Sequence, residues 1–329
     1  MKDGHMESDK IVCNNRDSVL RENLESLCLL QKGSFKAWAE NSSYLLCRNV
    51  ELENRVKIIV SGGASAGPLF SEFVGPGLAD GMAHGEFNCA PAAFSIFELG
   101  KIVSSGQGIL LLANNFTGDF LNNDMAAELL NDESIAAKAI YCSDDILSAR
   151  GEPRSERGGL CGIVFLIKIA AEMAKSGFSL NDIYRMLSDV NDRLHSITVT
   201  ISDDHEDVFY GEGFSGEKAP YSEKMSTVDG FVNTAIRMVL EDVPAKYRNA
   251  GSGCYVCVNR FRQLSSLEGN LIVRSVYNAL ERNQLNCGGI TVSHIFDTFD
   301  RKGCNISFLF VDDRIKGFLK PVQGYNFTV

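Results

Sequence analysis

The sequence predicts an α/β protein with two domains. Short β-rich runs alternate with longer amphipathic segments, which is the pattern of α/β architectures. The length of 329 residues suits two domains of ordinary size, and a hydrophobic content of 45% is enough for a core in each. We therefore expect two α/β domains, one over residues 1–192 and the other over residues 193–329.

The individual elements follow from apolar spacing. The predicted strands are β-rich apolar runs at residues 56–61, 109–113, 139–142, 197–201, 254–258 and 306–311. The predicted helices have apolar positions three and four residues apart, over residues 160–175, 179–194, 231–240 and 271–282. Two polar, glycine-containing stretches, residues 148–159 and 203–224, are expected to be surface loops.

Composition and charge exclude several classes of function. The chain has 32 basic and 42 acidic side chains and a net charge of −10, which argues against direct binding to nucleic acid, because that affinity comes mainly from Lys and Arg. Its apolar runs are far shorter than the ~20 residues of a membrane span. The N-terminus carries no apolar segment of signal-peptide length. We expect a cytoplasmic protein without a membrane span.

The ten cysteines are scattered, and only Cys254 and Cys257 lie close together in the sequence. Within a strand, these two thiols would point to opposite faces. A zinc site would need a second pair of cysteines or histidines, and none follows. We therefore expect reduced cysteines, no metal site and no cofactor.

A first glycine-rich segment, residues 62–68, follows the strand predicted at residues 56–61. Small residues at a strand-to-helix turn let backbone N–H groups approach a phosphate or a hydroxyl. The segment lacks both the Gly-Lys-Ser/Thr of a phosphate-binding loop and the Gly-x-Gly-x-x-Gly of a dinucleotide site. Contact with a ligand is one interpretation, and a tight turn is the other.

Two further segments carry polar groups. Asp119 comes shortly after the strand predicted at residues 109–113, and open α/β sheets bind ligands at the carboxyl ends of their strands. Asp119 is therefore a candidate to accept a proton or a hydroxyl hydrogen bond, or else it caps the following helix. Residues 210–218 contain Ser215 without a Gly-x-Ser-x-Gly frame, so this segment is interpreted as a flexible turn.

Together these segments resemble the K subunit of the phosphotransferase-dependent dihydroxyacetone kinases. The resemblance covers almost the whole chain, and its matching runs are residues 56–63, 73–78, 115–119, 157–162 and 308–313. It implies a two-domain α/β protein, usually a homodimer, that binds dihydroxyacetone and leaves nucleotide and magnesium to a separate subunit or domain. In the family, one histidine forms a covalent hemiaminal with the substrate, while a second histidine and an aspartate handle the proton of the reacting hydroxyl.

The same resemblance implies that reacting groups are lost. The acid–base histidine of the family falls on Gly67 and the hemiaminal histidine on Ser215, whereas the aspartate is retained as Asp119. The lysine that usually precedes the family's aspartate segment is Asn114. We expect no catalytic residues. The pocket implied by the resemblance would hold a small polyol or ketose, such as dihydroxyacetone, by weak hydrogen bonds from Gly62, Gly63, Ser65, Asn114, Asp119 and Ser215.

Two functions agree with these features. The first is a non-catalytic, ligand-sensing regulator of the operon co-activator type, which pairs with a transcription factor of the tetracycline-repressor fold. The acidic net charge fits such a protein, because its partner would make the DNA contacts. The alternative is a substrate-binding subunit of a dihydroxyacetone or related ketose kinase that works with a nucleotide-carrying subunit. A structural subunit that dimerises with an active paralogue is a third, less specific possibility.

The alternative requires another histidine near the pocket, which His84 or His205 would have to supply. His84 lies in a predicted turn, and His205 lies in an acidic run that is expected to be solvated. His195 is expected at the end of a helix, where a cation interacts favourably with the helix dipole.

Overall fold

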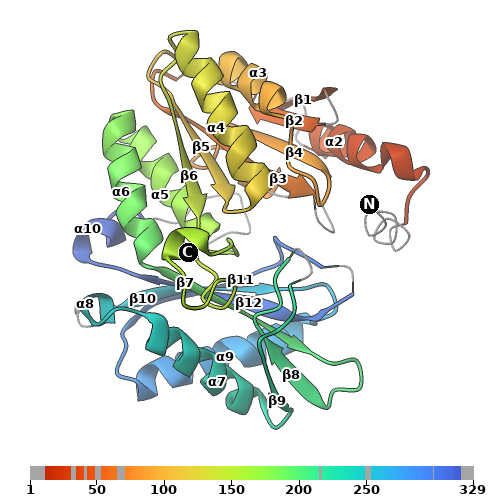
Figure 1. Cartoon of the computed structure of the whole chain (residues 1–329), viewed down its shortest axis with the longest axis vertical. Helices are drawn as coiled ribbons and strands as arrows, with labels where there is room; N and C mark the ends of the chain where they lie inside the picture. The colour runs from red at the N-terminus through yellow and green to blue at the C-terminus, as the bar shows by residue number, and fades with distance from the viewer. Residues whose placement is uncertain are drawn as a thin grey trace. The chain divides into compact units, whose positions relative to one another are not determined.

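The structure of the protein is a computed structural model that describes residues 12–30, 35–40, 43–48, 53–64, 71–214, 217–248, 253–298 and 300–319. The chain divides into two compact units, and each contains a six-stranded mixed sheet with helices (Figure 1). The first unit comprises Met1–Tyr141 and Ile167–Ser188, and the second comprises Cys142–Leu166 and Asp189–Val329. The α/β fold class is confirmed. The domain boundary after residue 192 stays a prediction, and the units differ from it in that Cys142–Leu166 groups with the second unit.

The sheet of the first unit has β3 near its centre. Its strands, in spatial order, are β1 (Phe35–Glu40), β2 (Ser43–Arg48), β4 (Gly81–Phe87), β3 (Lys57–Ala64), β5 (Ile109–Asn114) and β6 (Ala137–Cys142). β3 pairs in parallel with β4 and β5, whereas β2 pairs antiparallel with β1 and β4. All residues of β5 are buried, as expected for a parallel strand that is covered on both faces.

Helices α3 (Ala93–Val103) and α4 (Thr117–Asp132) cover one face of this sheet (Figure 1). Phe97 from α3 and Leu130 from α4 belong to a buried cluster that also contains Ile59 from β3. The remaining helices of residues 12–192 are η1 (Arg16–Ser18), α2 (Val19–Leu30), η2 (Ser71–Phe73), η3 (Arg154–Glu156), α5 (Ile163–Lys175) and α6 (Leu180–Asp192).

The second unit has a mostly antiparallel sheet. Its strands, in spatial order, are β11 (Cys287–Ser293), β10 (Cys254–Arg260), β12 (Lys302–Phe310), β7 (Leu194–Ile201), β8 (Asp207–Tyr210) and β9 (Tyr221–Lys224). Its helices are α7 (Val228–Asp242), α8 (Ala245–Arg248), α9 (Ser266–Arg282) and α10 (Asp313–Lys316).

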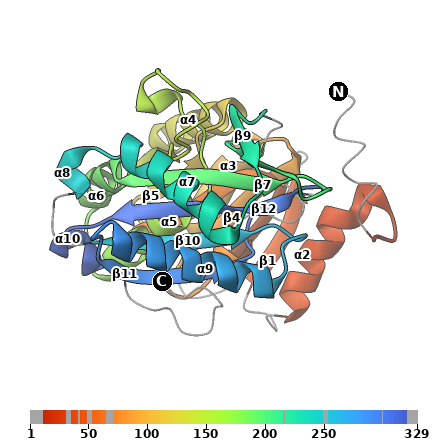
Figure 2. The same ribbon diagram turned by 90° about the horizontal axis from the view of Figure 1, so that it is seen from below.

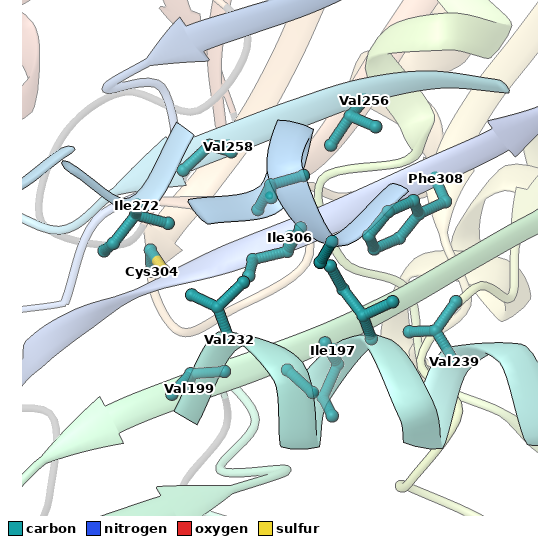
Figure 3. Close-up of a cluster of buried hydrophobic side chains, with 14 of the residues drawn as sticks. Ile197, Val199, Val232, Val239, Val256, Val258, Ile272, Cys304, Ile306 and Phe308 are labelled. Atoms are coloured by element: carbon teal, nitrogen blue, oxygen red, sulfur yellow. The ribbon is translucent and has the colours of Figure 1, made fainter. Parts of the chain in front are cut away.

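The core of the second unit lies between its sheet and the helix pair α7 and α9, which run side by side (Figure 2). Val232 and Val239 from α7 and Ile272 from α9 lie among side chains of β7, β10 and β12 (Figure 3). Each such side chain contributes about 1.5–3 kcal/mol when it is fully buried, so this interface is a main source of the unit's stability.

Helix α9 begins with a capping box. The Ser265 Oγ accepts a hydrogen bond from the backbone N–H of Glu268 at 3.2 Å, and the Glu268 carboxylate accepts one from the backbone N–H of Ser265 at 2.8 Å. We expect Ser265→Ala to lower the free energy of unfolding by about 1 kcal/mol, as measured by urea denaturation. Ser266→Ala, which removes a hydroxyl but no cap, is the control, and an equal loss in both variants would contradict the prediction.

All the strands and helices predicted from apolar spacing are present, with shifted ends. One loop prediction was wrong, because the stretch at residues 203–224 contains the hairpin strands β8 and β9. The placement of His84 in a turn was also wrong, since this residue lies within β4. Short strands with charged residues or glycines are formed by pairing with neighbours rather than by their own apolar pattern.

The ten cysteines are free thiols. Across the described ranges, no helix is both long and apolar enough to span a membrane. Nor do any three His, Cys, Asp or Glu side chains of these ranges cluster as metal ligands.

Candidate functional site

Four of the candidate ligand-binding residues lie at one edge of the first unit's sheet. Gly62 and Gly63 lie near the end of β3, Asn114 is the last residue of β5, and Asp119 lies in the first turn of α4. These segments are neighbours because β3 and β5 pair in parallel up to Ser61 and Ala113. The carboxyl ends of the two strands therefore form the edge at which open α/β sheets bind ligands.

The other candidate positions lie outside the described residues. They are Ser65, Gly67 and Ser215. Their assignment stays a prediction from the resemblance.

Glycines at this edge allow a loop to approach closely. A Cβ added to Gly63 would lie 2.9 Å from the carbonyl oxygen of Cys89, and one added to Gly85 would lie 2.1 Å from the same atom. A Cβ on Gly118, at the start of α4, would lie 3.1 Å from the Cβ of Ala90. The loop between β4 and α3 thus rests against the ends of β3 and β4 and the start of α4, and side chains at the first two glycines would push it away.

Asp119 is buried and incompletely paired. Only 6% of its surface is exposed, and its Oδ1 has no hydrogen-bond partner within the described part of the chain. Burial raises the pKa of its carboxyl to about 7. The helix-cap interpretation was wrong, because the N-cap residue is Phe116 and Asp119 comes three residues later. Near neutral pH this carboxyl is available both to accept and to donate a hydrogen bond.

Asn123 ties Asp119 to the sheet edge. Its Nδ2 donates to the backbone oxygen of Asp119 at 2.8 Å, and its Oδ1 accepts a hydrogen bond from the Ser61 Oγ at 2.9 Å. Asn123 and Ser61 are both fully buried. This chain of hydrogen bonds holds the first turn of α4 against the end of β3, so Asn123 is a positioning residue that the sequence reasoning missed.

The two candidate substitute histidines differ in environment. His84 is fully buried on β4 and pairs with Gly62 of β3, so it belongs to the sheet that carries the site edge. His205 is exposed in the turn between β7 and β8 of the second unit, with a positive φ of 62°. Among the described residues, His84 is therefore the histidine that the first unit places beside Gly62.

The second unit contains a partly buried ionic cluster that the sequence reasoning missed. Asp242 at the end of α7 accepts hydrogen bonds from both terminal nitrogens of Arg157, at 2.9 and 2.6 Å, and from the Nδ1 of His195 at 2.6 Å. These partners hold the pKa of Asp242 well below its usual range, although burial opposes them, and burial lowers the pKa of His195. The expectation of His195 at a helix end was wrong, since it lies on β7. No sequence signal links three residues so far apart.

The run at residues 157–162, which carries part of the family resemblance, has a structural task in this chain. The fully buried carboxylate of Asp144 accepts hydrogen bonds from the N–H groups of Leu160 and Gly162, at 2.6 and 2.8 Å, and from the hydroxyl of Ser196. A Cβ on Gly162 would lie 2.4 Å from the Asp144 Oδ2. This glycine is therefore required for the close approach of the carboxylate.

Sequence comparisons agree with this architecture. The model of the Dak1 domain matches residues 26–324. The chain is 26% identical over 302 residues to the dihydroxyacetone-binding subunit DhaK of PTS-dependent dihydroxyacetone kinase 2 from Listeria innocua, covering 88% of this chain and 90% of that subunit. It is also 26% identical over 280 residues to the L-erythrulose kinase of Pectobacterium atrosepticum, covering 81% of this chain but only 48% of that enzyme.

Solved structures share the fold. The dihydroxyacetone kinase of C. freundii superposes with a TM-score of 0.84 at 19% identity, covering 97% of this chain and 60% of that one. The dihydroxyacetone kinase operon co-activator DhaQ superposes with a TM-score of 0.82 at 21% identity, covering 91% of this chain and 95% of that one. A kinase and a co-activator thus have the same fold, and the fold alone does not distinguish their roles. With the Dak1 model matching nearly its whole length, the chain belongs to the Dak1 domain family.

Proposed function

We propose that this protein is a non-catalytic member of the family, which binds a small polyol or ketose such as dihydroxyacetone and acts on a dihydroxyacetone kinase operon through a protein partner. The proposal is carried by the retention of a buried Asp119 together with the absence of histidine at Gly67 and Ser215, the two positions that the resemblance assigns to histidines. General acid–base assistance typically contributes ~10²–10⁴-fold to a rate, and a covalent anchor adds positioning. Binding by hydrogen bonds needs neither group.

A regulatory role has a precedent on this fold in the co-activator DhaQ, which is similar to this chain in structure. A net charge of −10 suits a cytoplasmic protein that leaves DNA contacts to a basic partner, such as a transcription factor of the tetracycline-repressor fold. We propose a homodimer as the unit that meets this partner.

The second candidate function is a dihydroxyacetone-binding kinase subunit. It is favoured by the Listeria innocua relative, because the alignment covers 90% of that subunit. In this case a nucleotide-carrying subunit would supply the phosphoryl group.

A coupled assay tests the choice between the two. We expect calorimetry to detect weak, reversible binding of dihydroxyacetone and the assay to detect no triose phosphate when a phosphoryl donor and a nucleotide-carrying subunit of a family kinase are added. A family DhaK subunit that keeps both histidines is the positive control. Turnover above the blank that Asp119→Asn abolishes would overturn the proposal and establish the kinase function.

A further inference from the structure

Three positions form a row across the centre of the first unit's sheet. Ser61 faces α4, because its hydroxyl donates to Asn123 on that helix. Side chains alternate along a strand, so the next residue, Gly62, faces the opposite side. On one neighbouring strand Gly62 pairs with His84, and on the other Asn114 follows Ala113, the partner of Ser61. His84 and Asn114 therefore lie on the same face, on either side of a residue without a side chain.

The hydrogen bond of the His84 ring to the Gly85 carbonyl determines its tautomer. Its ring is fully buried and stacks on Tyr44, with ring centres 5.2 Å apart and an interplanar angle of 17°. The Nδ1 lies 2.9 Å from the carbonyl oxygen of Gly85, which can only accept, so Nδ1 carries the hydrogen. Burial lowers the pKa of His84 to about 4, and the ring is neutral at pH 7. The Nε2 is then an acceptor.

Both members of the row present an unused acceptor. The Nε2 of His84 and the Oδ1 of Asn114 are buried and have no hydrogen-bond partner among the described residues. Asn114 is only 4% exposed. Burying an acceptor without a hydrogen-bond partner costs free energy. Two such acceptors on one face of the sheet therefore indicate a donor that is not among the described residues. Neighbouring strands are about 4.8 Å apart, so the backbones of His84 on β4 and Asn114 on β5 are about 10 Å apart, with β3 between them. This separation suits a molecule of a few carbon atoms between the two side chains.

We propose that the His84 Nε2 and the Asn114 Oδ1 form a subsite across Gly62 that accepts hydrogen bonds from two hydroxyl groups of one small polyol or ketose. This inference rests on the proposed function and specifies how its ligand is recognised. Two acceptors select hydroxyl groups, which can donate, and disfavour carboxylates, which cannot at neutral pH. Binding requires no covalent bond to the histidine.

Calorimetry with glycerol and dihydroxyacetone tests the subsite. His84→Phe keeps a ring against Tyr44 but removes the Nε2, and Asn114→Leu removes the Oδ1 at similar size. One neutral hydrogen bond corresponds to a three- to tenfold change in Kd, and we expect each variant to weaken both ligands by this factor. Tyr44→Phe is the control, since it keeps the stacked ring and loses only the hydroxyl bond to Glu86, and it should bind as the wild type does.

The outcomes separate the two proposals. Wild-type binding with unchanged Kd in His84→Phe and Asn114→Leu overturns this inference alone, whereas no binding by the wild-type protein overturns the proposed function with it. A higher melting temperature of His84→Phe with unchanged Kd would identify an ordered water as the donor and also overturn the inference. If a variant fails to fold, ¹⁵N NMR of the wild-type imidazole decides: the Nε2 resonance of His84 must shift on saturation with glycerol.

Discussion

Replacing Asp144 with alanine is expected to lower the free energy of unfolding by about 3–5 kcal/mol. The carboxylate is fully buried and accepts hydrogen bonds from two backbone N–H groups and the Ser196 hydroxyl. Removing it takes the acceptor away from the two backbone N–H groups, whereas the Ser196 hydroxyl keeps a bond to the Ser307 hydroxyl at 2.7 Å, and each unsatisfied buried group costs about 1–3 kcal/mol. Urea denaturation followed by circular dichroism measures the loss.

Asp204→Ala is the matched control. The Asp204 carboxylate also accepts hydrogen bonds from the backbone N–H of Glu206, at 3.0 Å, and from the Ser202 hydroxyl. Unlike Asp144, however, it is exposed in a turn. Water replaces the lost acceptor there, and the expected loss is much smaller. Similar losses in the two variants would show that burial of the Asp144 carboxylate is not what makes its hydrogen bonds important.

Asp119→Asn is expected to stabilise the protein at neutral and higher pH. Burial raises the pKa of Asp119 from 3.8 to about 7 in the folded state. Between these values the folded protein binds a proton that the unfolded chain does not, so stability falls as the pH rises through this range. Asparagine does not titrate, and the variant avoids this loss. We expect a gain near zero at pH 4 that grows to about 2–4 kcal/mol at pH 8.

Thermal or urea unfolding at pH 4, 6 and 8 measures this difference. Asp182→Asn is the control, because Asp182 lies in the first turn of α6 as Asp119 does in α4, but it is exposed and bonded to Ser179 and Arg185. These bonds lower the pKa of Asp182, so its stabilisation is present above pH 4 and the control should be slightly destabilised at pH 8. A pH-independent effect of Asp119→Asn would show that its carboxyl is not titrating in this range.

A buried carboxyl that costs stability is a sign of a functional position. Asp119 retains this unfavourable burial at the edge at which open α/β sheets bind ligands, whereas the Asp144 carboxylate of the second unit accepts hydrogen bonds from two backbone N–H groups. The two predictions therefore have opposite signs for a physical reason. The Asp144 carboxylate accepts hydrogen bonds from its neighbours, whereas the Oδ1 of Asp119 has no hydrogen-bond partner among the described residues.

Much of the candidate site could be predicted from the sequence. Gly62 and Gly63 lie near the end of β3, Asn114 ends β5 and Asp119 lies in the first turn of the helix that follows. Apolar runs that end in glycine or polar residues identify the carboxyl ends of strands in an α/β sheet. Asn123 could not be found this way, because an asparagine within a helix has no distinctive pattern. Its role depends on the packing of α4 against the end of β3.

Several strands were also beyond sequence reasoning. β4 contains glycines at positions 81 and 85 and a histidine at 84, and this composition resembles a turn. It is a strand because β2 and β3 supply hydrogen-bond partners on both sides. The hairpin of β8 and β9 likewise contains charged residues, of which Asp207 and Lys224 pair across the two strands.

The sequence by itself determined the fold class and the acidic charge, because these features depend on composition and on local patterns, and it predicts, through the family resemblance, that Gly67 and Ser215 replace histidines. Only the tertiary structure decided that His84 lies beside Gly62, that its Nε2 is an acceptor, and that Asn114 shares its face across Gly62. Strand pairing brings residues 62, 84 and 114 into one row, and no local pattern of residues specifies which strands become neighbours.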